Sequence, residues 1–456
     1  MPISDINKIF SNKRAGVAMP TNSIERRRDY QRDYDRIIFS PDFRKLQDKT
    51  QVFPLPDGVL VHNRLTHSLE VSSVGRSLGA IIGRALCKKY AADLSPESKD
   101  FYEHDLYNVL AAAALCHDIG NPAFGHAGED AISAFFRKNE DLKEYFTEAG
   151  WQDLIHFEGN ANAMRLIAGN HCGQNRGGLQ LTYATLCAIA KYPCESTARD
   201  KKCIHRKKFG FFQPDKEIFT DIAAATCMIR ENDTPLSYLR HPFVWLVEAA
   251  DDICYNLMDL EDAHSLGIIE HQTCRDLLKN LVANLEIDDL HIIEQRLDSL
   301  EDREKQIAYL RSKAIGGLIT RTAEIYVDHF EEILNGTFAT SLFDLISEHT
   351  HELSEIVSFS VANVYNHIRV VEIENAGYNV MYELLSHLIP SIILPKEKRE
   401  VFDKKSVRLL PAAFNRDGEP EAERIWGVVD YVSGMTDNQA TSLYRKIKGI
   451  DIGFSY

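Results

Sequence analysis

The chain contains 456 residues, of which 44% are hydrophobic and 26% are charged, a composition typical of a globular protein that forms one large domain or two smaller ones. Its formal net charge of −15 argues against a protein whose whole surface binds nucleic acid, although local basic patches can still occur. The nine cysteines show no C-x-x-C pair, so neither a disulfide framework nor a zinc ribbon is indicated, and a reducing cytoplasm is the expected compartment.

The N-terminal residues MPISDINKIF lack the basic and apolar regions of a secretory signal. No apolar stretch approaches the roughly 20 residues that span a bilayer, so we expect a soluble protein with no membrane partner. Two basic patches stand out: Arg26, Arg27, Arg28 and Arg32, and then Lys201, Lys202, His205, Arg206, Lys207 and Lys208. Each patch is typical of a solvated loop or of salt-bridge partners, but the second would also suit binding of single-stranded DNA.

Apolar residues recur mostly at helical spacing, for example over 69–82 and 106–115, and this pattern predicts an all-α fold. The stretch 50–61 contains Pro and Gly and is predicted to hold a short β-hairpin at most, or only a loop. Two further loops are predicted over 170–178 and 193–215.

Beyond residue 270, the pattern over 292–319 predicts one long amphipathic helix with charges on one face. A boundary near 270 would separate a catalytic part, 1–270, from a helical C-terminal region, 271–456, that completes the substrate pocket and the oligomer contacts. No linker-like composition marks this boundary, so one continuous domain is an alternative.

The most informative stretch is CHDIGNP at 116–122, where an alanine-rich helical run ends in His117 and Asp118. A helix-terminal His followed by a capping Asp gives the same pattern, so the pair needs context. His67, at the start of a predicted helix, and Asp251, on an acidic helix, supply that context. Two neutral imidazoles and two carboxylates would form a hard-to-borderline metal site with positions left open for water or phosphate, which predicts a catalytic site.

The helix that carries Asp251 also carries Tyr255 and Asp259 at positions i+4 and i+8, so all three side chains share one face. Acidic residues on an otherwise apolar helix are costly unless they meet a cation or hydrogen-bond donors. This face is therefore a candidate lining of a binding site.

The H…HD…D pattern resembles the HD superfamily. Seven ordered blocks, more specifically, resemble the bacterial deoxyguanosinetriphosphate triphosphohydrolase family: RIIFSPDFRKLQDKTQVFP, RLTHSLEVSSVGRSLG, HDIGNPAFGHAGE, FEGNANAMRL, LTYATLCAIAKYP, EAADDICYNLMDLEDA and DYVSGMTD. The resemblance implies an HD-domain helical core with a C-terminal helical extension. It also implies metal-dependent hydrolysis of dGTP, or of other dNTPs, to a deoxynucleoside and tripolyphosphate.

By this resemblance, four residues bind the catalytic metal: His67, His117, Asp118 and Asp251. Mn²⁺ or Mg²⁺ is the expected divalent ion, with Fe, Ni, Co or Zn as alternatives. His126 and Glu129 are implied to act in catalysis, and their i, i+3 spacing would let the carboxylate orient the imidazole. The spacing does not tell whether His126 is a base, an acid or a nucleophile, and a helix N-terminal His with a capping-type Glu gives the same pattern.

The resemblance also implies substrate contacts. Phosphate contacts are expected from Arg64, Asn121, Lys191 and Tyr192, and deoxyribose contacts from Gln51, Tyr255 and Asp259. The block DYVSGMTD, with Tyr431 and Asp437, resembles a segment near the substrate pocket and receives no assigned contact. A homo-oligomer, expected to be a hexamer, is implied as well.

Two alternatives stay open. Another HD phosphohydrolase, such as a phosphodiesterase or a 5′-nucleotidase, would use the same four ligands. A degenerate HD protein would act as a nucleotide sensor or bind single-stranded nucleic acid. The pair His126 and Glu129 favours the triphosphohydrolase over both, while the base preference, the physiological metal and any allosteric activator are not determined by the sequence.

Overall fold

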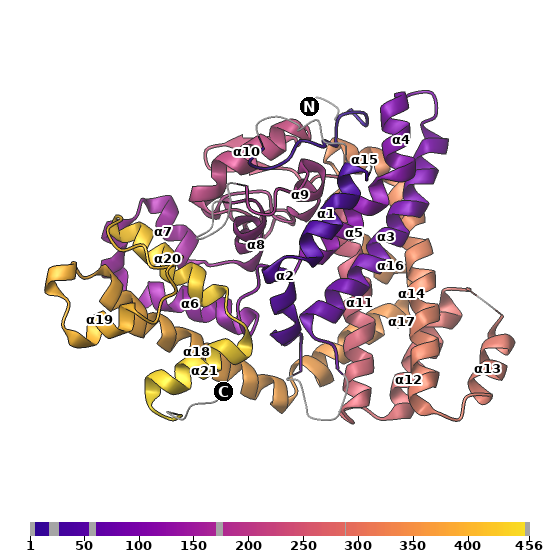
Figure 1. Cartoon of the computed structure of the whole chain (residues 1–456). Coiled ribbons are helices and arrows are strands. Elements are labelled where there is room, and N and C mark those ends of the chain that lie inside the picture. Colours follow the sequence, from indigo (N-terminus) through magenta and orange to yellow (C-terminus); the bar gives the residue numbers. More distant parts are fainter. Residues whose placement is uncertain (1–4, 18–26, 54–60, 170–176, 288, 452–456) are drawn as a thin grey trace.

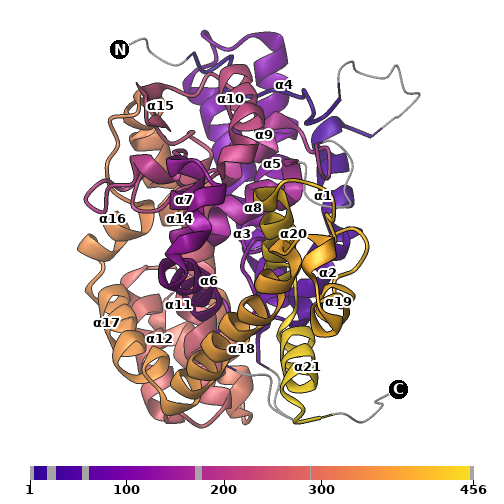
Figure 2. The same cartoon turned by 90° about the vertical axis from the view of Figure 1, so that its left-hand side faces the viewer.

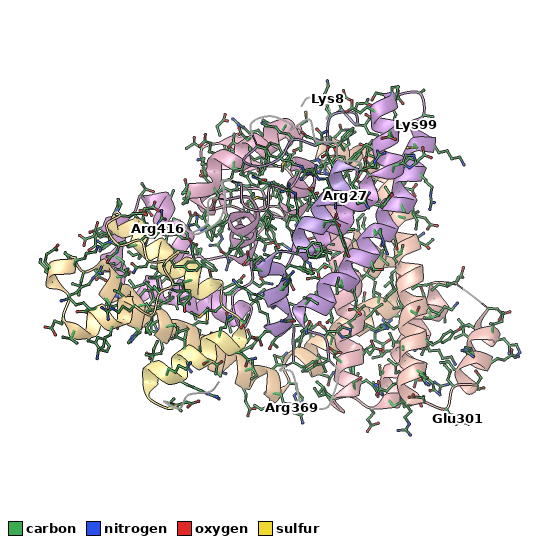
Figure 3. All side chains as sticks on the ribbon, viewed as in Figure 1. Lys8, Arg27, Lys99, Glu301, Arg369 and Arg416 are labelled. Carbon is green, nitrogen blue, oxygen red and sulfur yellow. The ribbon has the colours of Figure 1, made fainter. Side chains whose placement is uncertain are left out.

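The structure is a computed structural model that describes residues 5–17, 27–53, 61–169, 177–287 and 289–451. Its regular structure is almost entirely helical, which confirms the predicted all-α class (Figure 1). Side chains fill the space between the helices, and charged residues such as Lys8, Lys99 and Glu301 lie exposed at the periphery (Figure 3). No helix in these ranges is long and apolar enough to cross a membrane.

The helices fall on either side of a point near residue 270. The first part contains α1 (Asp29–Ile38), α2 (Pro41–Lys45), α3 (Arg64–Lys89), α4 (Pro96–His104), α5 (Leu106–Cys116), α6 (His126–Lys138), α7 (Glu148–Ile155), α8 (Gly159–Ala168), α9 (Tyr183–Ile189), α10 (Lys216–Ala225) and α11 (Val244–Ser265). The second part contains α12 (His271–Asn284), α13 (Leu290–Asp298), α14 (Arg303–Asp328), α15 (Phe330–Asn335), α16 (Leu342–His349), α17 (His351–Ser360), α18 (Ile368–Ile393), α19 (Val401–Val407), α20 (Glu421–Ser433) and α21 (Asp437–Lys448).

The described strands form one antiparallel pair, β1 (Arg230–Asp233) and β2 (Leu236–Tyr238), at a place where no hairpin was predicted. The strands have only four and three residues, and β1 is exposed throughout whereas β2 is buried throughout. Neither strand therefore shows the alternation of apolar and polar residues that predicts a strand from sequence. Of the stretch predicted to hold a hairpin or a loop, residues 54–60 lie outside the described ranges. The flanking residues Thr50 and Asn63 form an isolated antiparallel bridge.

The prediction of a single long helix over 292–319 is wrong, because the chain forms two helices there, α13 and α14, separated by residues 299–302. Asp302 explains the break. Its side chain accepts a hydrogen bond from the backbone N–H of Glu304 at 3.0 Å and caps the start of α14. An Asp side chain that bonds to the backbone in this way favours a helix start over a helix interior.

Close packing of α3 against α4 and α5 positions the ends of these helices. Gly75, Gly79 and Gly83 lie four residues apart on α3 and face α4 and α5. A Cβ atom on Gly79 would lie 2.6 Å from the Cα of Tyr107, and one on Gly83 would lie 2.0 Å from the carbonyl oxygen of Tyr102. These glycines let α3 and α5 run antiparallel in close contact, which places the start of α3 beside the end of α5.

The hydrophobic cores cross residue 270. One cluster combines side chains from α3, α5 and α11 with side chains from α12, α14, α16 and α17. A second cluster combines α6 and α7 with α18, α20 and α21, and Figure 1 shows these helices gathered on its left-hand side. In the view turned by 90°, α18 again lies beside α6 (Figure 2). The C-terminal helices are therefore part of the packing around the N-terminal ones.

Candidate active site

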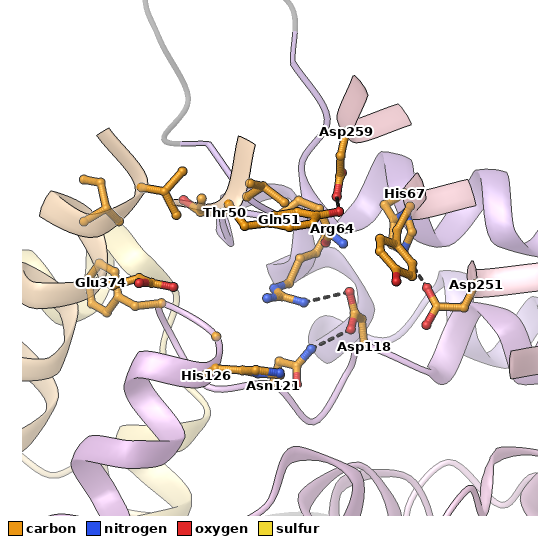
Figure 4. A pocket seen from close by; sticks show the side chains of 17 residues that line it. Thr50, Gln51, Arg64, His67, Asp118, Asn121, His126, Asp251, Asp259 and Glu374 are labelled. Carbon is orange, nitrogen blue, oxygen red and sulfur yellow. Dashed lines mark hydrogen bonds and ion pairs between the residues drawn. The ribbon is translucent and has the colours of Figure 1, made fainter. Parts of the chain in front are cut away.

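The four predicted metal ligands lie together where α3, α5 and α11 meet. Figure 4 shows three of them, His67, Asp118 and Asp251. Nε2 of His67 lies 3.0 Å from Oδ1 of Asp251, and Nε2 of His117 lies 3.5 Å from the same oxygen. Nε2 of His117 is also 3.7 Å from Oδ2 of Asp118. The donor atoms of His67, His117 and Asp118 all lie within 4.8 Å of one another, so the cluster has the dimensions of a metal site.

His117 is prepared as a ligand by its backbone contact. Its Nδ1 lies 2.6 Å from the carbonyl oxygen of Ala114, to which only a protonated Nδ1 can donate. Nε2 is then left with a free lone pair, and this buried atom has no hydrogen-bond partner among the described residues. A buried nitrogen of this kind is costly unless it meets a donor or a cation, so the site fits a divalent metal.

Asp118 is held as a carboxylate. Burial by itself would raise its pKa, but the nearby Arg64 and the two imidazoles outweigh burial and hold the pKa well below the ordinary value. Nη1 of Arg64 donates to Oδ2 of Asp118 at 2.8 Å, and the side-chain amide of Asn121 donates to Oδ1. Arg64 and Asn121, both predicted as phosphate contacts, therefore orient Asp118 and also line the adjoining cavity.

A cavity of about 400 Å³ opens beside the cluster. It is called the nucleoside cavity after the deoxyribose contacts that the sequence resemblance implies for its lining. Gln51, Tyr255 and Asp259, the three predicted deoxyribose contacts, all line it. Oε1 of Gln51 is buried and has no partner in the part of the chain that the structure describes. Burial raises the pKa of Asp259 to about 7, against a hydrogen bond of 2.8 Å that Oδ2 accepts from the Tyr365 hydroxyl. Both polar groups are available for a ligand hydroxyl.

The sequence analysis did not identify Tyr365 and Glu374, which are among the other residues that line this cavity. Both come from the C-terminal helical region, where no site residue was expected before Tyr431. Figure 4 shows Glu374 at the end of the cavity away from His67 and Asp251. No spacing rule could have found this pair, because Tyr365 precedes α18 and Glu374 lies within it.

A second cavity, of about 300 Å³, opens on the other side of the cluster and is here called the cationic cavity. Three of the four predicted phosphate contacts, Asn121, Lys191 and Tyr192, line it, and so does Lys208, from the second basic patch. Nζ of Lys191 lies 3.3 Å from Oε1 of Glu248, and Nζ of Lys208 lies 3.1 Å from Oε1 of Glu158. Burial lowers the pKa of each lysine, but the nearby carboxylates outweigh it and raise the pKa above the ordinary value.

His126 stands between the two cavities and lines both. Nδ1 of His126 lies 3.5 Å from Oε2 of Glu129, as the i, i+3 spacing predicted. Partial desolvation by the cavity walls, with Lys208 and Arg64 nearby, lowers the pKa of His126, although 75% of its side chain is accessible. The imidazole is therefore neutral at pH 7 and free to accept a proton.

Glu129 is buried and tied to the start of α8. Its Oε1 accepts the backbone N–H of Gly159 at 2.7 Å, and a Cβ atom on Gly159 would lie 2.5 Å from this oxygen. Burial and the neighbouring carboxylate of Glu158 raise the pKa of Glu129 to about 8. A carboxyl group with this pKa can exchange a proton near neutral pH, in contact with His126.

The remaining basic residues are mostly paired. Arg28 donates to Asp105 at 2.6 Å and also pairs with Asp100, and Arg27 pairs with Asp35 at 2.7 Å. In the second patch, His205 and Arg206 both contact Glu231, at 3.0 Å and 3.4 Å. Arg26 lies outside the described residues. The salt-bridge interpretation of these patches fits these residues. Lys208 is also paired, with Glu158, but it differs from the others because it lines the cationic cavity.

Comparison with known proteins gives matches over nearly the whole chain. Residues 64–192 match the HD domain family, and residues 345–446 match the phosphohydrolase-associated domain family. A protein of Synechocystis sp. called deoxyguanosinetriphosphate triphosphohydrolase-like is 37% identical, over 98% of this chain and 99% of that protein. A Listeria monocytogenes protein of the same description is 34% identical over 97% and 99%. A Yersinia enterocolitica protein called deoxyguanosinetriphosphate triphosphohydrolase is 30% identical over 92% and 94%.

Proposed function

Because the chain belongs to the family of deoxyguanosinetriphosphate triphosphohydrolase-like proteins with an HD domain, we propose that it hydrolyses a deoxynucleoside triphosphate to a deoxynucleoside and tripolyphosphate. One observation carries this proposal. The predicted metal cluster lies between the nucleoside cavity and the cationic cavity, and Asp118, Asn121, His126 and Asp251 line both. A dNTP placed across the cluster would have its sugar on one side, its β- and γ-phosphates on the other, and the scissile bond at the α-phosphate between them.

His67, His117, Asp118 and Asp251 would hold the metal, and Mn²⁺ or Mg²⁺ is the expected ion, with Fe, Ni, Co or Zn as alternatives. A divalent ion bound there supplies neutralisation of the phosphate charge and an activated water. Arg64 and Asn121 keep Asp118 ionised and directed toward the cluster. They thereby maintain one of the two anionic ligands that would hold such an ion.

Lys191 and Lys208 would bind the polyphosphate, since two ammonium groups converge on the cationic cavity and Tyr192 lines the same wall. His126 would move a proton at the reacting oxygen, because it is neutral and faces both cavities. Glu129, at 3.5 Å, would orient the imidazole. This division of labour separates metal binding from proton transfer.

In the nucleoside cavity, Gln51 and Asp259 would bind the 3′-hydroxyl, and the Tyr255 ring would lie against C2′ of the sugar. Glu374 would face the base. A carboxylate can accept two N–H bonds from the Watson–Crick edge of guanine, which presents N1–H and the N2 amino group. Adenine lacks this pair of donors. Glu374 therefore supports dGTP as the preferred substrate.

The proposed reaction is tested by incubating the metal-loaded protein with each of the four dNTPs and separating tripolyphosphate from pyrophosphate and phosphate. We expect tripolyphosphate and deoxynucleoside in equal amounts, formed fastest from dGTP. Pyrophosphate with a nucleoside monophosphate would contradict the proposal and would indicate cleavage at a different phosphate. Glu374→Gln is the matched variant for the base preference, because it exchanges one acceptor oxygen for a donor and should reduce the ratio of kcat/KM for dGTP to that for dATP.

We also propose that the chain assembles into a homo-hexamer, as its resemblance to the family implies.

We propose single-stranded DNA as a second partner. The exposed lysines Lys201, Lys202 and Lys207 of the second patch would contact its phosphates. A mobility shift of labelled single strands that weakens with rising salt concentration would support this partner, and no shift at low salt would contradict it.

A further inference from the structure

Asp437, from the block DYVSGMTD that received no contact in the sequence analysis, binds the backbone of two residues that line the nucleoside cavity. It is the first residue of α21. Its Oδ1 accepts the backbone N–H of Phe124 at 2.9 Å, and its Oδ2 accepts the backbone N–H of Thr50 at 2.9 Å. Thr50 and Phe124 both line the nucleoside cavity. One carboxylate therefore joins two segments that are far apart in the chain.

The Phe124 contact lies within the turn that leads from Asp118 to His126. Phe124 has a φ of +62°, in the left-handed region that a bulky residue rarely adopts, and Gly125 follows with a φ of +57°. Such a conformation is strained in a bulky residue and persists only where surrounding contacts determine it. The hydrogen bond from the Phe124 N–H to Asp437 is one such contact.

Two further contacts hold the same turn. The buried Lys49 donates a hydrogen bond from Nζ to the backbone carbonyl of Asn121, at the start of the turn. On the other side, Phe124 packs against Gly377 of α18 so closely that a Cβ atom there would lie 2.4 Å from Cβ of Phe124. The turn is thus braced by the segment 49–50 and by the C-terminal helices.

We propose that Asp437 is a positioning residue that fixes His126 and Gln51, which both line the nucleoside cavity, relative to each other. His126 follows Phe124 by two residues, and Gln51 follows Thr50 directly, so both side chains leave the backbone next to an amide that Asp437 binds. A shift of either segment changes the distance between the proton-transfer group and the group facing the sugar. The catalytic consequence rests on the proposed function, whereas the positioning itself does not.

Asp48 provides a matched control, because it ties the same end of α21 to the same segment without touching the turn. Its carboxylate accepts from the Thr436 hydroxyl and from the Asn438 side-chain amide. Asp48→Asn should weaken that end of α21 to a similar degree. It leaves both backbone amides on Asp437 and therefore leaves the turn in place.

Asp437→Asn keeps one acceptor oxygen and points an amino group at the other backbone N–H. We expect kcat to fall by about tenfold or more, with metal content retained and KM changed by less than about threefold, because orientation and not affinity is lost. Hydrogen exchange in a peptide covering residues 121–126 should accelerate. Asp48→Asn should change neither kcat nor this exchange rate. An equal fall of kcat in both variants, or an unchanged kcat and exchange rate in folded Asp437→Asn, overturns the proposal.

Exchange in the wild-type protein provides a measurement that needs no variant. The amides of Thr50 and Phe124 should be protected, and fast exchange at both amides overturns the proposal even if Asp437→Asn fails to fold. If the wild-type protein hydrolyses no dNTP, the proposed function fails. The positioning role is then still supported if the two amides are protected in the wild-type protein and in Asp48→Asn but not in Asp437→Asn. If the two amides are not protected in the wild-type protein, the positioning role is overturned.

Discussion

Asp251 has an oxygen atom 3.0 Å from the ring of His67 and 3.5 Å from that of His117, and it lines both cavities. Asp251→Ala should therefore lose bound metal and turnover together, because the site loses one of its two anionic ligands. Elemental analysis of the purified variant is the measurement. Asp259→Asn, two turns along the same face of α11, is the control and should retain its metal. Stoichiometric metal in Asp251→Ala would contradict the ligand assignment.

His126 lines the same cavities, and its Nδ1 contacts Glu129 at 3.5 Å. His126→Ala should keep its metal and its affinity for dNTP while kcat falls on the order of 100-fold or more, since a proton-transfer group is removed. Metal analysis and a binding titration, made beside the kinetics, separate the two roles. Loss of metal in this variant would make His126 a ligand instead.

Tyr255 lines the nucleoside cavity one turn from Asp251 and one turn from Asp259. A ribonucleotide would bring its 2′-hydroxyl against the ring without a partner, at a cost of roughly 1–3 kcal/mol. Tyr255→Ala should therefore reduce the ratio of kcat/KM for dGTP to that for GTP. Both ratios are measured on folded, metal-loaded protein, and an unchanged ratio would show that Tyr255 does not select the sugar.

At the scale of elements, a histidine joins the segment before α3 to α11. Nδ1 of His62 lies 2.8 Å from Oδ1 of Asp262, and Nε2 lies 3.2 Å from Oε1 of Glu70. Burial lowers the pKa of His62, but the hydrogen bonds to these two carboxylates outweigh it and raise the pKa to about 10. The folded protein therefore holds a proton here that the unfolded chain releases near its ordinary pKa of 6.5.

A raised pKa stabilises the fold fully below the unfolded pKa of 6.5, and this contribution declines as the pH rises to about 10. His62→Gln should therefore lower the free energy of unfolding by about 1.5–3 kcal/mol at pH 7 and by much less at pH 10.5. Denaturant unfolding of both proteins at the two pH values measures the difference. The control is His156→Gln, because burial lowers the pKa of His156 to about 4 and leaves it uncharged over this range. A deficit that is constant with pH would contradict the assignment.

At the scale of the molecule, apolar side chains remain exposed next to the nucleoside cavity. Val361 and Ile368 are 51% and 61% exposed, and they lie close in the chain to the cavity residues Tyr365 and Val370. Light scattering at micromolar concentration should give about six times the chain mass of 51.8 kDa. Ile368→Asp should lower this mass if these residues lie between subunits. A mass of one chain for the wild-type protein would contradict the hexamer.

The sequence alone was sufficient for the helical class and for features that depend on spacing within one helix. Residues at i, i+3 and i+4 face one way whatever surrounds them, so the contact of His126 with Glu129 and the common face of Asp251, Tyr255 and Asp259 followed from position. The resemblance of the ordered blocks to a known family also predicted that His67, His117 and Asp118 lie in one cluster. Such a resemblance carries information about contacts between residues far apart in the chain, which spacing within one helix does not.

Tertiary structure alone decided which further side chains reach the site. Lys208 looked like part of a solvated patch, Glu374 belonged to a helix without a motif, and Asp437 had a block but no contact. Each arrives from a segment distant in sequence, through packing of α18 to α21 on α6 or through an irregular connection. Local preferences do not encode such distances, because the free energy that determines them comes from apolar surface shared between helices across the whole chain.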